Sequence, residues 1–190
     1  MQTPSTDAGK IEFIHFNQVH SMAVAPALLS ATLDHLRRFA PFDQMEPAHL
    51  LWLAERLRIG YYAKGEAVLA PEQGEPNTFF IIKQGVVQGE RGGGEGDGAW
   101  LELNEGECFP IGALLSRRAA ISVFRAQTDV FCYELAAEGF HELLRLSPAF
   151  HDFCTLRLAN LLAQSQRQTQ AQYATSSADQ QSLSSPLSAI

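Results

Sequence analysis

The sequence predicts a mainly β domain with α-helices at both ends, and three observations support this. Between residues 58 and 135, short segments rich in β-branched and aromatic residues alternate with turn signals. On both sides of this region, apolar residues recur at three- and four-residue spacing, which is typical of helices. Hydrophobic residues make up 46% of the 190 residues, enough for the core of one ordinary domain. Consecutive short strands of this kind predict a single antiparallel sandwich or jelly-roll barrel.

Two helices are expected ahead of the strands. From Leu28 the apolar residues recur every three or four positions until Pro41. A second helix is predicted from Pro47, because proline is favoured at the first helical position, and Gly60 marks its predicted end. Residues 1–27 form a predicted N-terminal extension. Its apolar patch consists of Ile11, Phe13, Ile14 and Phe16.

The strand pattern is interrupted by turn signals at short intervals. The predicted strands are residues 58–63, 67–70, 78–83, 86–90, 99–104, 121–126 and 130–135. Glycine, proline and polar residues fill most of the gaps, which favours short connections. The glycine-rich run at 92–98 predicts a hairpin tip. It does not indicate a phosphate-binding loop, because neither a Lys-Ser/Thr pair nor a helix follows it.

Helical patterning returns after the last strand and then stops. Ser147 followed by Pro148 supplies an N-cap and a first helical residue for a further helix. After Ala163 the sequence is mostly Gln, Ser, Thr and Ala, whose small apolar surface cannot offset the entropy of ordering. Residues 164–190 are therefore predicted to be a flexible linker, and residues 28–163 the domain itself. The apolar ending "PLSAI" indicates a further C-terminal domain.

Composition and charge exclude several classes of protein. With 21 acidic and 14 scattered basic side chains, the chain lacks the basic face of a general nucleic-acid binder. No apolar run approaches the roughly 18 residues that span a bilayer, and no secretory signal opens the sequence. The three cysteines are too far apart for a Cys-x-x-Cys metal site. We expect buried thiols in a cytoplasmic protein that binds neither nucleic acid nor membrane.

Residues that could catalyse a reaction are not indicated. None of the six histidines falls between residues 58 and 135, so a metal-dependent barrel enzyme is not expected. There is no Gly-x-Ser-x-Gly elbow and no cysteine with a local catalytic signature. The carboxylates of Glu102, Glu105 and Glu107 lie near a predicted turn, where solvated acids are ordinary. The chain is therefore predicted not to be an enzyme and to need no cofactor.

Several loop positions resemble one known family. In "LAERLRIGYYAKGEAVLAPEQGEPNTFFIIKQGVV", which follows "LRRFAPFDQM", a strand, Lys-Gly-Glu, a second strand, Glu-x-Gly and an aromatic-Ile strand lead to Gly85. Gly106-Glu107-Cys108-Phe109 then follows. Over residues 36–162, about two thirds of the chain, the sequence resembles a cyclic-nucleotide-binding domain. The resemblance implies an antiparallel β-roll, or jelly-roll barrel, of the kind found in cyclic-AMP receptor proteins.

The resemblance also implies a phosphate-binding cassette from Phe109 onward. Small residues there let backbone N–H groups approach a phosphate, and one arginine pairs with it. Arg118, followed by two alanines, is the best match to that arginine, and Arg117 is the alternative. The implied ligand is a cyclic nucleotide such as cAMP, or a related nucleotide. The implied ligand-binding residues are Phe109, Pro110, Ile111, Gly112, Ala113, Leu114, Arg117, Arg118, Ala119 and Ala120.

The cassette departs from the family pattern at two positions. Where the family usually has Phe-Gly-Glu, this sequence reads Phe109-Pro110-Ile111, so Ile111 replaces the acid that accepts the ribose hydroxyl. Losing that hydrogen bond should weaken the binding of ordinary cAMP by roughly 1.5–3 kcal/mol. Either the ligand differs, or the domain is degenerate.

The variant itself resembles a bacterial subgroup. "GECFPIGALL", "FRAQTDVFCYEL" and "FHELLRLSPAFHDFC" are similar to segments of signalling proteins in which such a domain precedes a pair of CBS domains and a nucleotidyltransferase-like region. The resemblance implies that this chain is the N-terminal sensory part of a longer protein. Any transferase activity would lie outside these residues.

Two functional hypotheses remain open. The first is a regulatory domain that senses a nucleotide in the cassette and signals through its flanking helices. The second is a degenerate β-roll that binds no ligand and acts in dimerisation or protein interaction. A homodimer through the helices is predicted in either case, because the helix after Ser147 is apolar around much of its circumference. A transcription factor is not indicated, since no helix-turn-helix follows.

Overall fold

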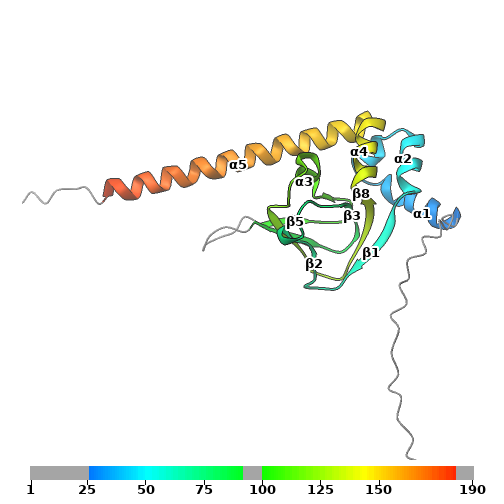
Figure 1. The fold of residues 1–190 in the computed structure, drawn as a ribbon, viewed down its shortest axis with the longest axis horizontal. Helices are drawn as coiled ribbons and strands as arrows, with labels where there is room; N and C mark the ends of the chain where they lie inside the picture. Colours follow the sequence, from blue (N-terminus) through cyan, green and yellow to red (C-terminus); the bar gives the residue numbers. More distant parts are fainter. Residues whose placement is uncertain (1–25, 92–99, 183–190) are drawn as a thin grey trace, which may run out of the picture.

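The structure is a computed structural model of the chain and describes residues 26–91 and 100–182. Two helices, α1 (Pro26–Leu36) and α2 (Pro47–Ala54), precede the strands, with a short 3₁₀ turn at Phe42–Gln44 between them. The helix α4 (Ala137–Leu146) and the long helix α5 (Pro148–Ser182) follow the strands. The predicted order of helices, strands and helices is confirmed (Figure 1).

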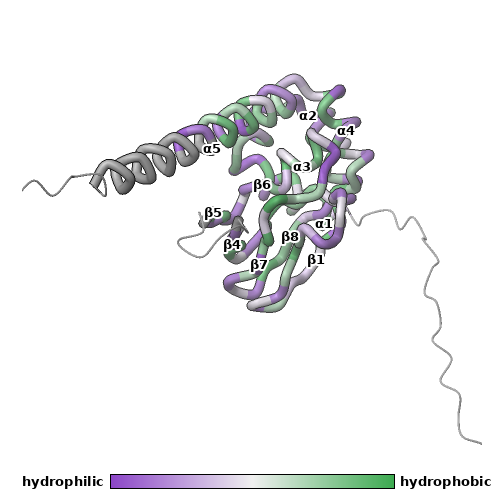
Figure 2. Tube along the Cα trace, turned by 60° about the vertical axis from the view of Figure 1, so that its left-hand side comes forward, coloured by the Kyte–Doolittle hydropathy of each residue, from purple (hydrophilic) through white to green (hydrophobic). Residues whose placement is uncertain are grey.

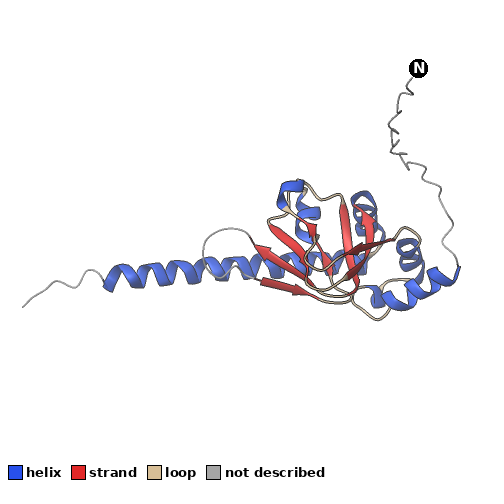
Figure 3. Cartoon of the chain, turned by 90° about the horizontal axis from the view of Figure 1, so that it is seen from below, coloured by secondary structure: helices blue, strands red, loops and turns tan. Residues whose placement is uncertain are grey.

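The eight strands form two antiparallel four-stranded sheets. The strands are β1 (Arg58–Tyr62), β2 (Ala67–Leu69), β3 (Thr78–Gln84), β4 (Val87–Arg91), β5 (Trp100–Leu103), β6 (Cys108–Phe109), β7 (Ser122–Ala126) and β8 (Val130–Ala136). A 3₁₀ turn at Pro71–Gln73 joins β2 to β3, and the short helix α3 (Ile111–Ser116) joins β6 to β7. The sheet orders are β1-β8-β3-β6 and β2-β7-β4-β5. The described strands thus form a jelly-roll of two facing sheets that do not close into a barrel (Figure 3).

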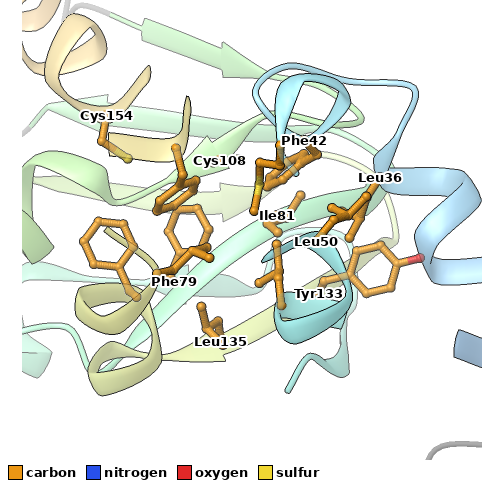
Figure 4. Close-up of a cluster of buried hydrophobic side chains, with 14 of the residues drawn as sticks. Leu36, Phe42, Leu50, Phe79, Ile81, Cys108, Tyr133, Leu135 and Cys154 are labelled. Carbon is orange, nitrogen blue, oxygen red and sulfur yellow. The ribbon is translucent and has the colours of Figure 1, made fainter. Parts of the chain in front are cut away.

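Two hydrophobic clusters lie on opposite faces of the sheet β1-β8-β3-β6. The first, which we call the helical layer, lies between that sheet and the helices (Figure 4); its members include Leu36, Phe42, Leu50, Leu53, Phe79, Ile81, Cys108, Ile111, Leu114, Tyr133, Leu135, Phe140, Leu143, Phe150 and Cys154. The second, which we call the roll interior, lies between the two sheets; its members are Val68, Leu69, Phe80, Ile82, Val87, Leu103, Phe109, Ala120, Phe124, Ala126, Val130 and Cys132. Figure 2 shows the hydrophobic stretches concentrated along the strands and on the helices that cover them.

Ser147 sets the junction between the two C-terminal helices as the sequence predicted. Its side chain is 1% exposed and its hydroxyl accepts a hydrogen bond from the Phe150 N–H at 3.4 Å, so it acts as the N-cap of α5. Pro148 is the first residue of the helix. The three cysteines are buried and unpaired, also as predicted.

Gly60 does not end the second helix, contrary to the prediction. The helix α2 ends at Ala54, and Gly60 lies inside β1, opposite Cys132 of β8. A Cβ atom at position 60 would overlap the carboxylate of Glu134. A larger residue here would require the Glu134 side chain, 74 positions later in the sequence, to move away from its present position.

The helix α5 also differs from the prediction, because it continues well past Ala163 to Ser182. Glutamine, alanine and arginine are good helix formers, and a helix already nucleated at Ser147 needs only propagation. Residues 164–182 of the predicted flexible linker are therefore helical, and their role as a linker to a further domain stays a prediction. The described part of α5 extends away from the β-roll (Figure 1). The rest of the predicted linker, the N-terminal extension up to residue 25 and the glycine-rich run at 92–98 lie outside the described residues.

Candidate ligand-binding site

The predicted cassette contains the short helix α3 (Ile111–Ser116). The helix starts at Ile111, and the Leu114 N–H donates to the Pro110 carbonyl oxygen at 3.1 Å. It ends at Arg117, whose backbone is left-handed (φ 51°). The Arg118 N–H then donates to the Ala113 carbonyl oxygen at 3.2 Å, which closes the helix in a Schellman arrangement.

The helix α3 divides its side chains between the two clusters. Ile111 and Leu114, 4% and 1% exposed, pack in the helical layer, whereas Ala113 packs against the roll interior. Gly112 faces α5: a Cβ atom built on it would lie 3.9 Å from Leu158 Cδ1. Ile111, which the resemblance aligns with the family's ribose-binding acid, therefore points toward the helices.

Three stacked aromatic rings fill the roll interior beside the cassette. Phe109 lies between Phe80 and Phe124. Its ring centroid is 5.0 Å from that of Phe80, with an interplanar angle of 17°, and 4.7 Å from that of Phe124, with an interplanar angle of 22°. Phe109 is 2% exposed. These parallel rings occupy the space directly inside the end of β6, so Phe109 serves as a core residue in this conformation.

The two arginines of the cassette lie on the surface where α3 ends. Arg117, Arg118 and Ala119 are exposed, whereas Ala120 is buried in the roll interior. Among the described residues, neither arginine side chain makes a hydrogen bond or an ion pair. The chain is not extended at Arg117, so the alternation of side chains along a strand does not decide which arginine faces a ligand.

The turn just before the cassette is tied to helices at both ends of the chain. The Glu105 carboxylate lies 3.6 Å from Arg38 Nη1 and 3.7 Å from His35 Nδ1, both near the end of α1. The Glu107 carboxylate accepts a hydrogen bond from the Asn104 N–H at 2.8 Å and lies 3.3 Å from Arg157 Nη2 of α5. The sequence indicated only solvated turn residues at these positions and did not predict the contacts of Glu105 with α1 or of Glu107 with α5.

Gly106 allows that turn to approach Phe39, in the segment just after α1. Its φ of 85° favours glycine, and a Cβ atom there would overlap the ring of Phe39. Burial lowers the pKa of the neighbouring His35, and the nearby Arg38 and Lys83 act in the same direction, whereas Glu105 opposes them. The only signal in the sequence was the Glu-Gly-Glu triplet itself, which does not identify its partners.

One polar pair on the inner side of the sheet was also missed. The Tyr62 hydroxyl donates to Glu134 Oε1 at 2.7 Å, and Tyr62 packs against the roll interior. Burial and the Glu134 carboxylate both raise the pKa of Tyr62, so the phenol is neutral near neutral pH. Since Tyr62 and Glu134 are 72 positions apart, no local pattern could have paired them.

The described part of the chain shows no other chemistry at the cassette. No group of three His, Cys, Asp or Glu side chains among the described residues could hold a metal ion. A surface hollow of about 190 Å³ lies between α5 and β5. It is lined by Leu101, Arg157, Asn160, Leu161 and Arg167. None of the described helices has the length and apolarity to cross a membrane.

The two sheets and the flanking helices define a β-roll domain. The profile of the family described as "Cyclic nucleotide-binding domain" matches residues 60–147, which run from β1 to the start of α5. Residues 60–147 therefore form a domain of the cyclic-nucleotide-binding family, and the predicted resemblance is confirmed. No protein with a curated description matches the sequence.

Solved structures share this fold at low sequence identity. The regulatory domain of Toxoplasma gondii PKA with cAMP is 15% identical, with a TM-score of 0.63 over 70% of this chain and 51% of that one. Thermus thermophilus catabolite activator protein is 22% identical, with a TM-score of 0.52 over 70% of this chain and 60% of that one. A cAMP-independent PKA regulatory subunit from Trypanosoma cruzi, bound to guanosine, is 18% identical, with a TM-score of 0.60 over 73% of this chain and 50% of that one. The chain thus spans 50–60% of the length of these three proteins.

Proposed function

We propose that this chain is a regulatory domain that binds a cyclic nucleotide such as cAMP, or a related nucleotide, through the arginines of its cassette. The observation that carries the proposal is the pair Arg117-Arg118, exposed at the end of α3 within a domain of this family. A guanidinium group that has no partner among the described residues is available to a phosphate, which it can bind through two parallel hydrogen bonds.

The orientation of Ile111 narrows the class of ligand. Its side chain lies in the helical layer, so α3 offers no carboxylate to a ribose hydroxyl at this position. The phosphate must then supply most of the polar recognition. We expect weaker discrimination of the sugar than in a cassette with the acid, and the nucleoside-bound relative from Trypanosoma cruzi supports testing ligands other than cAMP.

Signalling would pass from the cassette to α5. Gly112 faces Leu158 and Leu161 of α5, and Glu107 contacts Arg157 of the same helix. A ligand that draws α3 toward its phosphate would therefore change how α5 packs, which shifts the population between two arrangements of that helix. In a longer bacterial cytoplasmic protein, α5 would carry this change to C-terminal CBS and nucleotidyltransferase-like domains.

Calorimetric titration of the protein with cAMP, cGMP, AMP, GMP and guanosine tests the proposal. With the nucleotide that binds, Arg118→Ala should cost roughly 2–5 kcal/mol of binding free energy, because Arg118 best matches the family's phosphate-binding arginine and its loss would leave the bound phosphate unpaired. Arg117→Ala should cost under about 1 kcal/mol, as for a solvated surface charge. Arg145→Ala, which removes an exposed arginine of α4, is the control and should leave Kd unchanged.

A second candidate, a β-roll that binds no ligand and acts in dimerisation, is favoured by two other observations. Phe80, Phe109 and Phe124 fill the space inside the cassette, and Leu156 and Leu162 of α5 are 63% and 58% exposed. The other apolar residues that suggested a dimer are largely covered, since Phe150 is buried and Leu158 and Leu161 face α3. Two results together would favour this candidate over nucleotide binding. No nucleotide would give heat in the titration, and light scattering would show a dimer that Leu156→Glu converts to a monomer.

A further inference from the structure

The outer edge of β1 is the longest free edge among the described strands. This strand pairs with β8 on one side and has no described strand on the other. It has five residues, whereas the other three edge strands, β2, β5 and β6, have three, four and two. An exposed strand edge presents unpaired N–H and C=O groups, and proteins usually cover such an edge.

On the helix-facing side of β1 the apolar side chains are exposed, next to the exposed Arg58 at the start of the strand, whereas Phe131 of β8 is half-buried. Ile59 and Tyr61 of β1 are 48% and 54% exposed, and Leu28 of α1 is 49% exposed. The Tyr61 ring lies 5.2 Å from that of Phe131 on β8. We call Leu28, Ile59, Tyr61 and Phe131 the apolar strip. It continues the helical layer: Tyr133, directly opposite Ile59 in the sheet, is only 2% exposed because α1 and α2 cover it, whereas these helices leave Ile59 and Tyr61 exposed.

A hollow connects the strip to the start of α1. Its volume is about 330 Å³, and its lining includes Leu28, Thr32, Leu57, Ile59 and Tyr133. The hollow is thus bounded by α1, the segment after α2, and β1. A few apolar side chains entering it would bury both the exposed face of Ile59 and that of Leu28.

We propose that the N-terminal segment at residues 11–16, "IEFIHF", docks along β1 of the same chain and covers the apolar strip. This segment has four apolar side chains in six residues. Its alternation of apolar and polar residues over Ile11, Glu12 and Phe13 suits an added edge strand, whose backbone would pair with the free edge of β1.

The connection to α1 allows this docking. Residues 17–25 lie between the segment and Pro26, where α1 begins two residues before Leu28. Nine residues can span up to about 30 Å, whereas β1 is only about 16 Å long. Tethering gives the segment an effective concentration in the millimolar range, so it outcompetes the same segment of a second copy at ordinary protein concentrations.

A disulfide trap in the full chain tests the proposal. The variant Phe13→Cys/Ile59→Cys should form an intramolecular disulfide under mild oxidation, detected as a 13–59 peptide pair in a monomeric band. The native cysteines are buried and should not compete. The control is Phe13→Cys/Ile121→Cys, since Ile121 is 65% exposed outside the strip, before β7. We expect the 13–59 bond to form at least about 10-fold faster than the 13–121 bond.

Two results would overturn the proposal. Equal rates for the two pairs would mean that the segment has no preferred position. A 13–59 disulfide found only in covalent dimers would mean that a second copy covers the strip.

Hydrogen exchange provides an independent readout without oxidation. In the wild type, the amides of residues 58–62 should exchange more slowly than in the variant Phe13→Asp/Ile14→Asp, by about 10-fold or more. The control is Asn17→Asp/Gln18→Asp, which adds the same charge directly after the segment and should behave as the wild type. Unchanged exchange at β1 in the Phe13/Ile14 variant would also refute the docking.

Discussion

The two faces of the sheet β1-β8-β3-β6 are both aromatic, but their rings are arranged differently. In the helical layer, the rings of Phe79 and Phe150 lie edge to face, with centroids 5.6 Å apart and an interplanar angle of 87°. In the roll interior, the neighbouring Phe80 begins a parallel stack with Phe109 and Phe124. This edge-to-face contact holds the C-terminal helix α5 against the sheet, whereas the stack fills a space between two sheets.

The cassette helix α3 contributes side chains to both regions. Ile111 and Leu114 fix α3 in the helical layer, while Phe109 and Ala113 lie against the roll interior. A movement of α3 toward a ligand must therefore disturb the packing of the helices. The positions that contribute to the helical layer are expected to control stability, and those at the exposed end of α3 are expected to control binding.

Ile111→Glu should cause the largest loss of stability. If the domain tolerated this change, the helical layer would not be the region that controls stability. Because this position is 4% exposed among apolar side chains, an ionised carboxylate there should cost more than about 3 kcal/mol of unfolding free energy. It should not restore affinity for cAMP, although it restores the residue type of the family. Ser116→Glu, an exposed position on the same helix, is the control and should cost under about 1 kcal/mol in urea denaturation.

Truncating the two neighbouring phenylalanines of β3 should show that the helical layer and the roll interior are destabilised independently. Phe79→Ala and Phe80→Ala should each cost roughly 3–5 kcal/mol, because both side chains are buried. Hydrogen exchange should locate the damage differently: in α4 and the start of α5 for Phe79→Ala, and in β6 and β7 for Phe80→Ala. The same pattern of exchange in both variants would show that the two clusters respond as a single core.

Arg117→Gly should slightly increase the unfolding free energy, in contrast to the preceding variants. A left-handed backbone costs a non-glycine residue roughly 1–2 kcal/mol, which the greater entropy of glycine in the unfolded chain partly offsets. We expect a gain in unfolding free energy of about 0.5 kcal/mol, measured by thermal denaturation. Arg118→Gly, at a position without a positive φ, should instead be destabilising by a similar amount.

The pH dependence of stability should report the contact between α1 and the turn before the cassette. Since burial lowers the pKa of His35 below 6.5, the unfolded chain binds a proton there that the folded domain does not. Stability should therefore fall as the pH drops from about 6.5 through the lower pKa of the folded state. His35→Gln should flatten this dependence between about pH 7 and pH 5. His151→Gln, at an exposed position of α5, is the control and should keep the wild-type slope.

Much of this domain could be predicted from local patterns. Seven of the eight strands (all but β6), the start of α2 at Pro47 and the cap at Ser147 follow from residue type and spacing within a few positions. The order of the glycines and the cassette arginines was sufficient to indicate the family. These features were predictable because turns, caps and strand alternation depend on the conformation of a few adjacent residues.

Only the tertiary structure decided which side each residue faces and what it contacts. It turned Ile111 toward the helices, placed Gly60 against the Glu134 carboxylate, and tied Glu105 and Glu107 to α1 and α5. It also extended α5 to Ser182, where composition alone suggested a linker. In the first three cases the deciding contacts join residues far apart in sequence, which no local pattern encodes. In the last, a helix begun by packing against the domain continued into residues that would not have started one.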